Sequence, residues 1–125
     1  MTKSNAAETL EGSKEYTELH DMASHACELL KAMANEWRLM ILCQLSEGEK
    51  TVSELQAILG LSQSALSQHL ARLRSVRIVK TRRVAQTIFY SLNGQTAEAM
   101  LLALYELFGS SDGENGVDHH RSSAA

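Results

Sequence analysis

The sequence predicts a mainly helical domain of the α+β class, with five helices and a two-stranded β-hairpin. Three observations lead to this prediction. A short helix, a glycine turn and an amphipathic helix follow one another between residues 53 and 74, two β-rich segments come directly after them, and a strongly apolar helix follows the second segment. The apolar fraction of 44% is ordinary for a globular protein, and 125 residues correspond to one domain.

The first two helices come from apolar periodicity and one capping residue. Residues 1–14 are polar and rich in glutamate, so we expect a disordered arm before a domain that spans residues 15–108. The first helix is predicted to begin near Tyr16. Asn35 is placed to cap a second helix that runs from Glu36 to about Ser46, and residues 47–50 form a turn.

The next segment has the signals of a helix-turn-helix. Residues 53–56 fit a capping box, with Val52 as the apolar staple residue before it, and predict a short helix that ends at Leu59. Gly60 can adopt the left-handed conformation that ends a helix, and Ser62 offers a hydroxyl to cap the next one. The dimensions of the two helices and their turn are those of a helix-turn-helix.

The helix after Ser62 has two different faces. Its apolar stripe follows a spacing of four and then three residues and consists of Leu66, Leu70 and Leu73. Its other face carries Gln63, Ser64, Ser67, Gln68 and Arg72. A face that needed only solubility would more often hold Glu and Lys, whereas Gln, Ser and Arg hydrogen-bond base edges and phosphates. We therefore interpret this helix as a recognition helix.

A β-hairpin is predicted directly after the recognition helix. Residues 78–82 and 87–92 are rich in β-formers, and Ile88, Tyr90 and Leu92 alternate with other residues in the second segment. The link over residues 83–86 is short enough for a hairpin with a basic tip. A helix-turn-helix followed by such a hairpin is a winged helix-turn-helix.

The last helix, from Thr96 to Phe108, is apolar nearly all round. A surface helix of so small a monomer should have a polar face, so this helix is predicted to pack against a partner, with the first helix as its companion. The resulting homodimer would place two recognition helices about 34–36 Å apart. The expected interface residues are Leu19, Met22, Ala26, Met100, Leu101, Leu104, Tyr105 and Phe108. Residues 109–125 are expected to form a disordered tail.

The charges are segregated along the chain, although the net charge is only -3. Residues 55–97 contain no Asp or Glu but six basic side chains, whereas the rest of the chain holds all 15 acidic residues and the other six basic ones, a balance of -9. This pattern predicts a positive surface on an acidic body, as in proteins that bind phosphate backbones.

Several classes of protein are not expected. No apolar run approaches the roughly 20 residues of a membrane span, and the first residues lack the apolar region of a signal peptide, which favours a cytoplasmic protein without a membrane partner. Two cysteines do not make a disulfide framework. No catalytic arrangement is suggested on the ordered elements, so we do not expect an enzyme.

Three motifs in order resemble the ArsR (SmtB-type) winged-helix repressors. They lie at residues 30–42, 61–74 and 82–90, and the similarity extends from about residue 28 to residue 108. Within the family, the chain most resembles the branch that contains BigR, SqrR, HlyU and NolR. The resemblance implies a homodimer that binds double-stranded DNA at an inverted-repeat operator overlapping a promoter.

The resemblance also implies which residues approach DNA. By position, the groove-facing residues would be Ser62, Gln63, Ser64, Ser67, Gln68 and His69, and the wing residues would be Arg82, Arg83, Gln86 and Thr87. Arg72 and Arg74 are assigned to backbone phosphates from their chemistry alone. Gln63 and Gln68 are the expected base readers, because an amide pairs with adenine through two hydrogen bonds.

The signal that the regulator would sense stays open. Metal sensors of this family bind ions through cysteines in the third helix or through Asp and His on the last, and neither set occurs here, so no metal or cofactor is expected. Relatives that sense persulfides use two cysteines. Cys43 matches the first, but Gly109 occupies the second position, so only a single-thiol sensor at Cys43 remains as an alternative. Cys27 is interpreted as a small buried hydrophobic residue.

A second alternative belongs to another functional class. The winged helix could have lost DNA binding and serve as a protein-interaction module that uses its basic face for an acidic partner. The absence of acidic residues from positions 55–97 and the Gln/Ser face of the recognition helix argue against this alternative.

Overall fold

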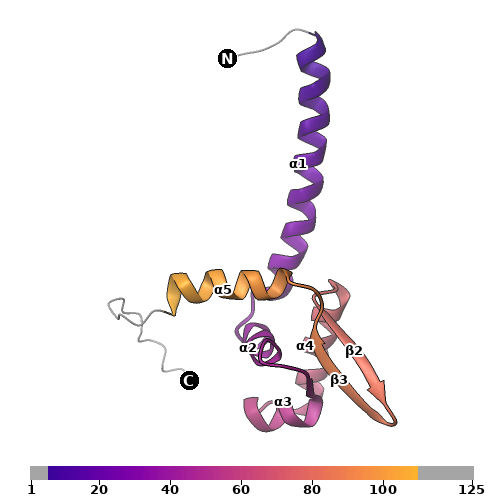
Figure 1. Cartoon of the computed structure of the whole chain (residues 1–125), viewed down its shortest axis with the longest axis vertical. Helices are drawn as coiled ribbons and strands as arrows, with labels where there is room; N and C mark the ends of the chain where they lie inside the picture. The colour runs from indigo at the N-terminus through magenta and orange to yellow at the C-terminus, as the bar shows by residue number, and fades with distance from the viewer. Residues whose placement is uncertain (1–5, 110–125) are drawn as a thin grey trace.

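The computed structural model describes residues 6–109, so the expectations for residues 1–5 and 110–125 lie outside the described part of the chain. Within it, five helices and a three-stranded sheet follow one another (Figure 1). The elements are α1 (Ala6–Met33), α2 (Glu36–Leu45), β1 (Lys50–Thr51), α3 (Val52–Leu59), α4 (Gln63–Ser75), β2 (Val79–Val84), β3 (Thr87–Leu92) and α5 (Thr96–Phe108). The predicted α+β winged helix-turn-helix is confirmed, with one strand more than expected.

Helix α1 extends away from the body formed by the other elements (Figure 1). It begins at Ala6 and not near Tyr16, so residues 6–14, which we expected to be disordered, are helical. This stretch lacks apolar periodicity, but Ala, Glu, Leu and Lys are good helix formers and can continue a helix on propensity alone. Among the side chains described, from residue 12 onward, the first buried one in α1 is Leu29.

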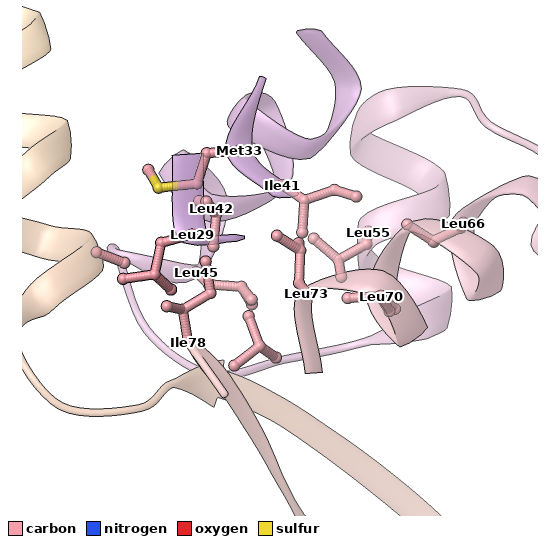
Figure 2. Packing of buried hydrophobic residues seen from close by; sticks show 12 residues of the cluster. Leu29, Met33, Ile41, Leu42, Leu45, Leu55, Leu66, Leu70, Leu73 and Ile78 are labelled. Atoms are coloured by element: carbon pink, nitrogen blue, oxygen red, sulfur yellow. The ribbon is translucent and has the colours of Figure 1, made fainter. Parts of the chain in front are cut away.

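The core lies between α2, α3, α4 and the end of α1 (Figure 2), and Ile78 and Val79 at the start of the wing and Ala97 of α5 also belong to it. The predicted leucine stripe of α4 is confirmed, since Leu66, Leu70 and Leu73 are each at most 1% exposed. They pack in one cluster with residues of α2 and α3 that include Ile41 and Leu55. Burying three such side chains contributes about 1.5–3 kcal/mol each and holds α4 firmly on the body.

The sheet has the order β1-β3-β2 and is antiparallel throughout. The turn expected over residues 47–50 ends one residue early, because Lys50 pairs with Tyr90 and Thr51 with Phe89. A strand of two residues has no alternation that a sequence pattern could reveal. The sheet joins the segment before α3 to the wing formed by β2 and β3.

The wing turn is tighter than the predicted four-residue link. Val84 pairs with Thr87, so the turn itself consists of Ala85 and Gln86. Ala85 has φ = 58°, a left-handed conformation that glycine adopts more readily than alanine. On β3, Tyr90 and Leu92 pack against the core, as their alternation predicts.

Helices α1 and α5 expose large apolar side chains. Leu19 and Met22 on α1 are 57% and 58% exposed, and Tyr105 and Phe108 on α5 are 66% and 78% exposed. Leu102 and Leu107 are also exposed, whereas Met100 and Leu101 pack against the core. Among residues 6–109, no helix has the length and hydropathy required to cross a membrane.

Candidate nucleic-acid interface

The turn between α3 and α4 is built by local hydrogen bonds. Gly60 has φ = 75°, and its N–H donates to the carbonyl oxygen of Gln56 at 2.8 Å, which ends α3 as predicted. The Ser62 hydroxyl accepts from the Ala65 N–H at 3.1 Å and caps α4. Helix α4 therefore leaves the turn in a direction set by both caps.

The N-terminal cap of α3 differs from the prediction. Thr51, and not Ser53, is the capping residue: its hydroxyl accepts from the Glu54 N–H, and Glu54 accepts in return from the Thr51 N–H at 2.8 Å. Val52, expected as the staple residue before the helix, is its first residue and packs against the core. The sequence offers a hydroxyl at both positions, and the pairing of Thr51 with β3 places the first one at the helix start.

The face of α4 opposite the leucine stripe is open to solvent. Of the predicted contacts near the start of α4, Ser62, Gln63, Ser64, Ser67 and Gln68 are all exposed, and so is Arg74 near its end. Arg72 is half-buried, and its guanidinium lies 3.5 Å from the Ser75 hydroxyl. The helical period brings Ser64 and Gln68 to the middle of the open face.

Ala71 is a residue that the sequence interpretation passed over. It is exposed, and the helical period places it beside Gln68 on the side opposite the leucines. A small apolar side chain at the centre of such a face can contact the methyl group of thymine. The signal was available in the spacing, because positions 64, 68 and 71 share one face of a helix.

His69 faces the body of the protein. It is half-buried, and its Nδ1 lies 3.4 Å from the Nη1 of Arg38 on α2. Partial burial and the positive charge of Arg38 lower the pKa of His69. Arg38 also donates to the carbonyl oxygens of Ala32 and Lys31, so His69 belongs to a group that connects α4 to the end of α1.

Three of the four predicted DNA contacts on the wing are exposed side chains, and the fourth forms an ion pair. Arg83, Gln86 and Thr87 are exposed at or next to the turn. Arg82 instead donates from Nε and Nη2 to the two carboxylate oxygens of Glu49, at 2.7 and 2.8 Å. Glu49 lies outside the acid-free stretch of the sequence, and β1 brings it back to the wing.

Both cysteines are exposed in the described chain. The prediction that Cys27 is a buried residue is therefore wrong for the single chain. Cys43 adjoins a hollow of about 390 Å³ that is lined mainly by apolar residues of α5 and also by Gly109. Partial burial and the negative charge of Glu47 raise the pKa of the Cys43 thiol. The reactive thiolate is therefore disfavoured at Cys43.

Known proteins share this sequence and architecture. Residues 35–81, from the cap of α2 into β2, match a family model described as bacterial regulatory protein, arsR family. The chain is 52% identical to the transcriptional activator HlyU of Vibrio cholerae serotype O1 over 91 residues. These aligned residues are 73% of this chain and 84% of that protein. It is 45% identical to the biofilm growth-associated repressor of Agrobacterium fabrum over 86 residues. These aligned residues are 69% of this chain and 74% of that protein.

The crystal structure of NolR from Sinorhizobium fredii is similar with a TM-score of 0.70 and 41% sequence identity, over 89% of this chain and 100% of that chain. These likenesses agree with the helix-turn-helix, the wing and the exposed face of α4. The chain belongs to the ArsR family of bacterial regulatory proteins, which are DNA-binding transcription regulators and not enzymes.

Proposed function

We propose that the protein is a transcriptional repressor that binds an inverted-repeat operator in promoter DNA as a homodimer. The observation that carries the proposal is the division of α4 into two faces. Three buried leucines hold one face on the body, while the other presents amides, hydroxyls and one alanine to solvent. A helix held in this way can enter the major groove without giving up its packing.

The proposed contacts divide into base readers and phosphate ligands. Gln68 would form two hydrogen bonds with an adenine, and Ala71 would contact a neighbouring thymine methyl group. Gln63 would read a second base in the same way as Gln68. Ser62, Ser64 and Ser67 lie near the start of α4, where the backbone N–H groups also favour phosphate. Arg72, Arg74 and the wing residues Arg83, Gln86 and Thr87 would hold the backbone on either side. His69 would support α4 from behind.

The test is binding of the purified protein to the promoter region of its own gene. We expect Gln68→Ala to lose about 1–3 kcal/mol of affinity at each of the two half-sites of the operator, while binding to an unrelated duplex stays the same. Gln95→Ala is the matched control, because Gln95 is exposed at the start of α5 and its side chain makes no capping bond. If wild-type protein binds all duplexes equally or none, the proposal fails, and the second result would favour a protein-interaction module.

The proposed homodimer rests on α1 and α5. Most of α1 packs on nothing in the described chain, although Tyr16, Leu19 and Met22 form an exposed apolar stripe along it. In proteins most helical stability comes from packing of an apolar face, and a partner would supply that packing for α1. The exposed apolar side chains of α5, such as Tyr105, supply a second surface of the same kind. A second copy provides both surfaces at once.

The direction of control needs its own experiment, since one relative is named an activator and another a repressor. Repression is the simpler mechanism for this chain: a dimer seated on a promoter blocks the polymerase without any further contact. In transcription with purified polymerase, we expect added protein to reduce the transcript. An increase in transcript would identify an activator.

A thiol-responsive version of the same regulator is less well supported. The raised pKa of Cys43 opposes thiolate chemistry, although the side chain is accessible. Mass spectrometry after sulfide or peroxide treatment tests this alternative. An adduct on Cys43 together with altered operator affinity would establish it, and the absence of both would remove it.

A further inference from the structure

An arginine on the wing is bound across the outer face of the sheet. Arg82 lies on β2, and its guanidinium carbon is 4.8 Å from the centre of the Phe89 ring on β3. Beyond Phe89 it reaches Glu49, which directly precedes β1, through two hydrogen bonds. The side chain of Arg82 thus spans the width of the three-stranded sheet.

The register of the strands explains this arrangement. Arg82 pairs with Phe89 on one side of β3, and Thr51 pairs with Phe89 on the other, so the three residues share one level of the sheet. Strands β1 and β3 have only two residue pairs between them. Strand β1 leads directly into α3, which packs against α4. The contact with Glu49 therefore strengthens the short junction between the wing and the helix-turn-helix.

The two hydrogen bonds to Glu49 also use the N–H groups with which Arg82 would bind a phosphate. The fork of two N–H groups that binds a carboxylate is the same fork that binds a phosphate. Here Glu49 takes that fork and neutralises the charge. The hydrogen bonds and charge of Arg82, together with the charge of Lys80, lower the pKa of Glu49, so the carboxylate stays ionised at neutral pH. On the same wing, Arg83 is exposed next to the turn.

We propose that Glu49, Phe89 and Arg82 form a wing clamp, in which Arg82 is a positioning residue that sets the wing relative to α4 and is not itself a phosphate ligand. Arg83 takes the role of the wing's phosphate ligand. The roles of Arg82 and Arg83 toward phosphate rest on the proposed DNA binding, but the clamp itself is a property of the free protein.

The first experiment measures operator affinity of the full chain at several salt concentrations for Arg82→Gln and Arg83→Gln. A lost phosphate contact lowers the salt slope by about 0.9. The homodimer has two wings, so we expect about twice this decrease for Arg83→Gln. Arg82→Gln keeps the wild-type slope and weakens binding by about two- to fivefold for each wing at every salt concentration, the range of an exposed ion pair. An equal decrease in slope for both variants would make Arg82 a phosphate ligand and overturn the proposal.

The second experiment needs no DNA. Hydrogen exchange of the β1–β3 amides should be faster in Glu49→Gln and in Arg82→Gln than in wild type, and no faster in the double variant than in either single one. Arg83→Gln should leave exchange unchanged. Wild-type exchange rates in Arg82→Gln would refute the clamp. If wild-type protein bound no DNA while both clamp variants exchanged faster, the proposed function would fail and the clamp would stand.

Discussion

At the scale of single residues, the environment of His69 in α4 makes the stability of the fold depend on pH. Its ring is half-buried beside Arg38, and both burial and that positive charge lower its pKa below the ordinary 6.5. The unfolded chain binds a proton near pH 6.5 and the folded chain only at lower pH. Between these two values the unfolded state holds more protons, so the stability of the fold decreases as the pH falls.

We therefore expect wild-type protein to lose stability when the pH is lowered from 7.5 to 5.5. His69→Gln should lose less over the same range, because the substituted side chain does not titrate. Urea unfolding at each pH measures both. Parallel pH profiles for the two proteins would contradict this account of His69.

Two residues with left-handed backbones should respond in opposite ways to exchange of glycine and alanine. A Cβ at Gly60 would meet no atom within 4 Å, so only the backbone conformation opposes Gly60→Ala. We expect that change to lower the free energy of unfolding by about 1 kcal/mol, and Ala85→Gly in the wing turn to raise it by up to about 1 kcal/mol. Thermal unfolding measures both, and a destabilised Ala85→Gly variant would argue against strain in the turn.

At the scale of elements, the start of α3 shows which of two possible capping boxes forms. Thr51 and Ser53 each precede a possible partner by three residues, namely Glu54 and Gln56. Glu54 completes the capping box with Thr51, while the side chain of Gln56 instead donates to the carbonyl oxygen of Leu61 at 3.4 Å. The sequence pattern contained both possibilities, and the strand that ends at Thr51 selects between them.

This assignment predicts different costs for two hydroxyl deletions. Thr51→Ala removes the cap and should cost about 1 kcal/mol of stability, whereas Ser53→Ala should stay within about 0.5 kcal/mol of wild type. Denaturant unfolding of the two variants provides the comparison. A larger cost for Ser53→Ala would restore the capping box predicted from sequence.

At the scale of the whole molecule, the described chain leaves a long apolar surface uncovered. Met22 lies on the stripe of α1 that we assign to the homodimer, and Ser24 lies on the opposite side of the same helix and is also exposed. A charge placed on the stripe has to be desolvated in a dimer, but a charge on the other side does not.

We therefore expect Met22→Glu to shift the protein toward monomer at concentrations where wild type is dimeric. Ser24→Glu adds the same charge and should leave the assembly unchanged. Sedimentation velocity over a dilution series measures this, and operator affinity should fall together with the dimer. Equal behaviour of the two variants would place the interface elsewhere.

Much of the fold follows from local patterns. Leu66, Leu70 and Leu73 repeat at helical spacing, and Gly60 and Ser62 carry the conformations and hydrogen bonds of their own turn, so neighbouring residues suffice to predict the helix-turn-helix. The exposed face of α4 follows from the same spacing. The early start of α1 was missed because propensity, and not periodicity, maintains the helix there.

The sequence alone determined the family, through three motifs that follow one another along the chain. It also determined the helix-turn-helix and the face of α4 that meets solvent, because each of these depends on residues within a few turns of one another. Only the tertiary structure decided that Arg82 is bound by Glu49, 33 residues away, and that His69 turns toward Arg38. Those contacts form when the sheet closes and α4 packs on α2. No local pattern records which distant side chain will then lie within hydrogen-bond distance.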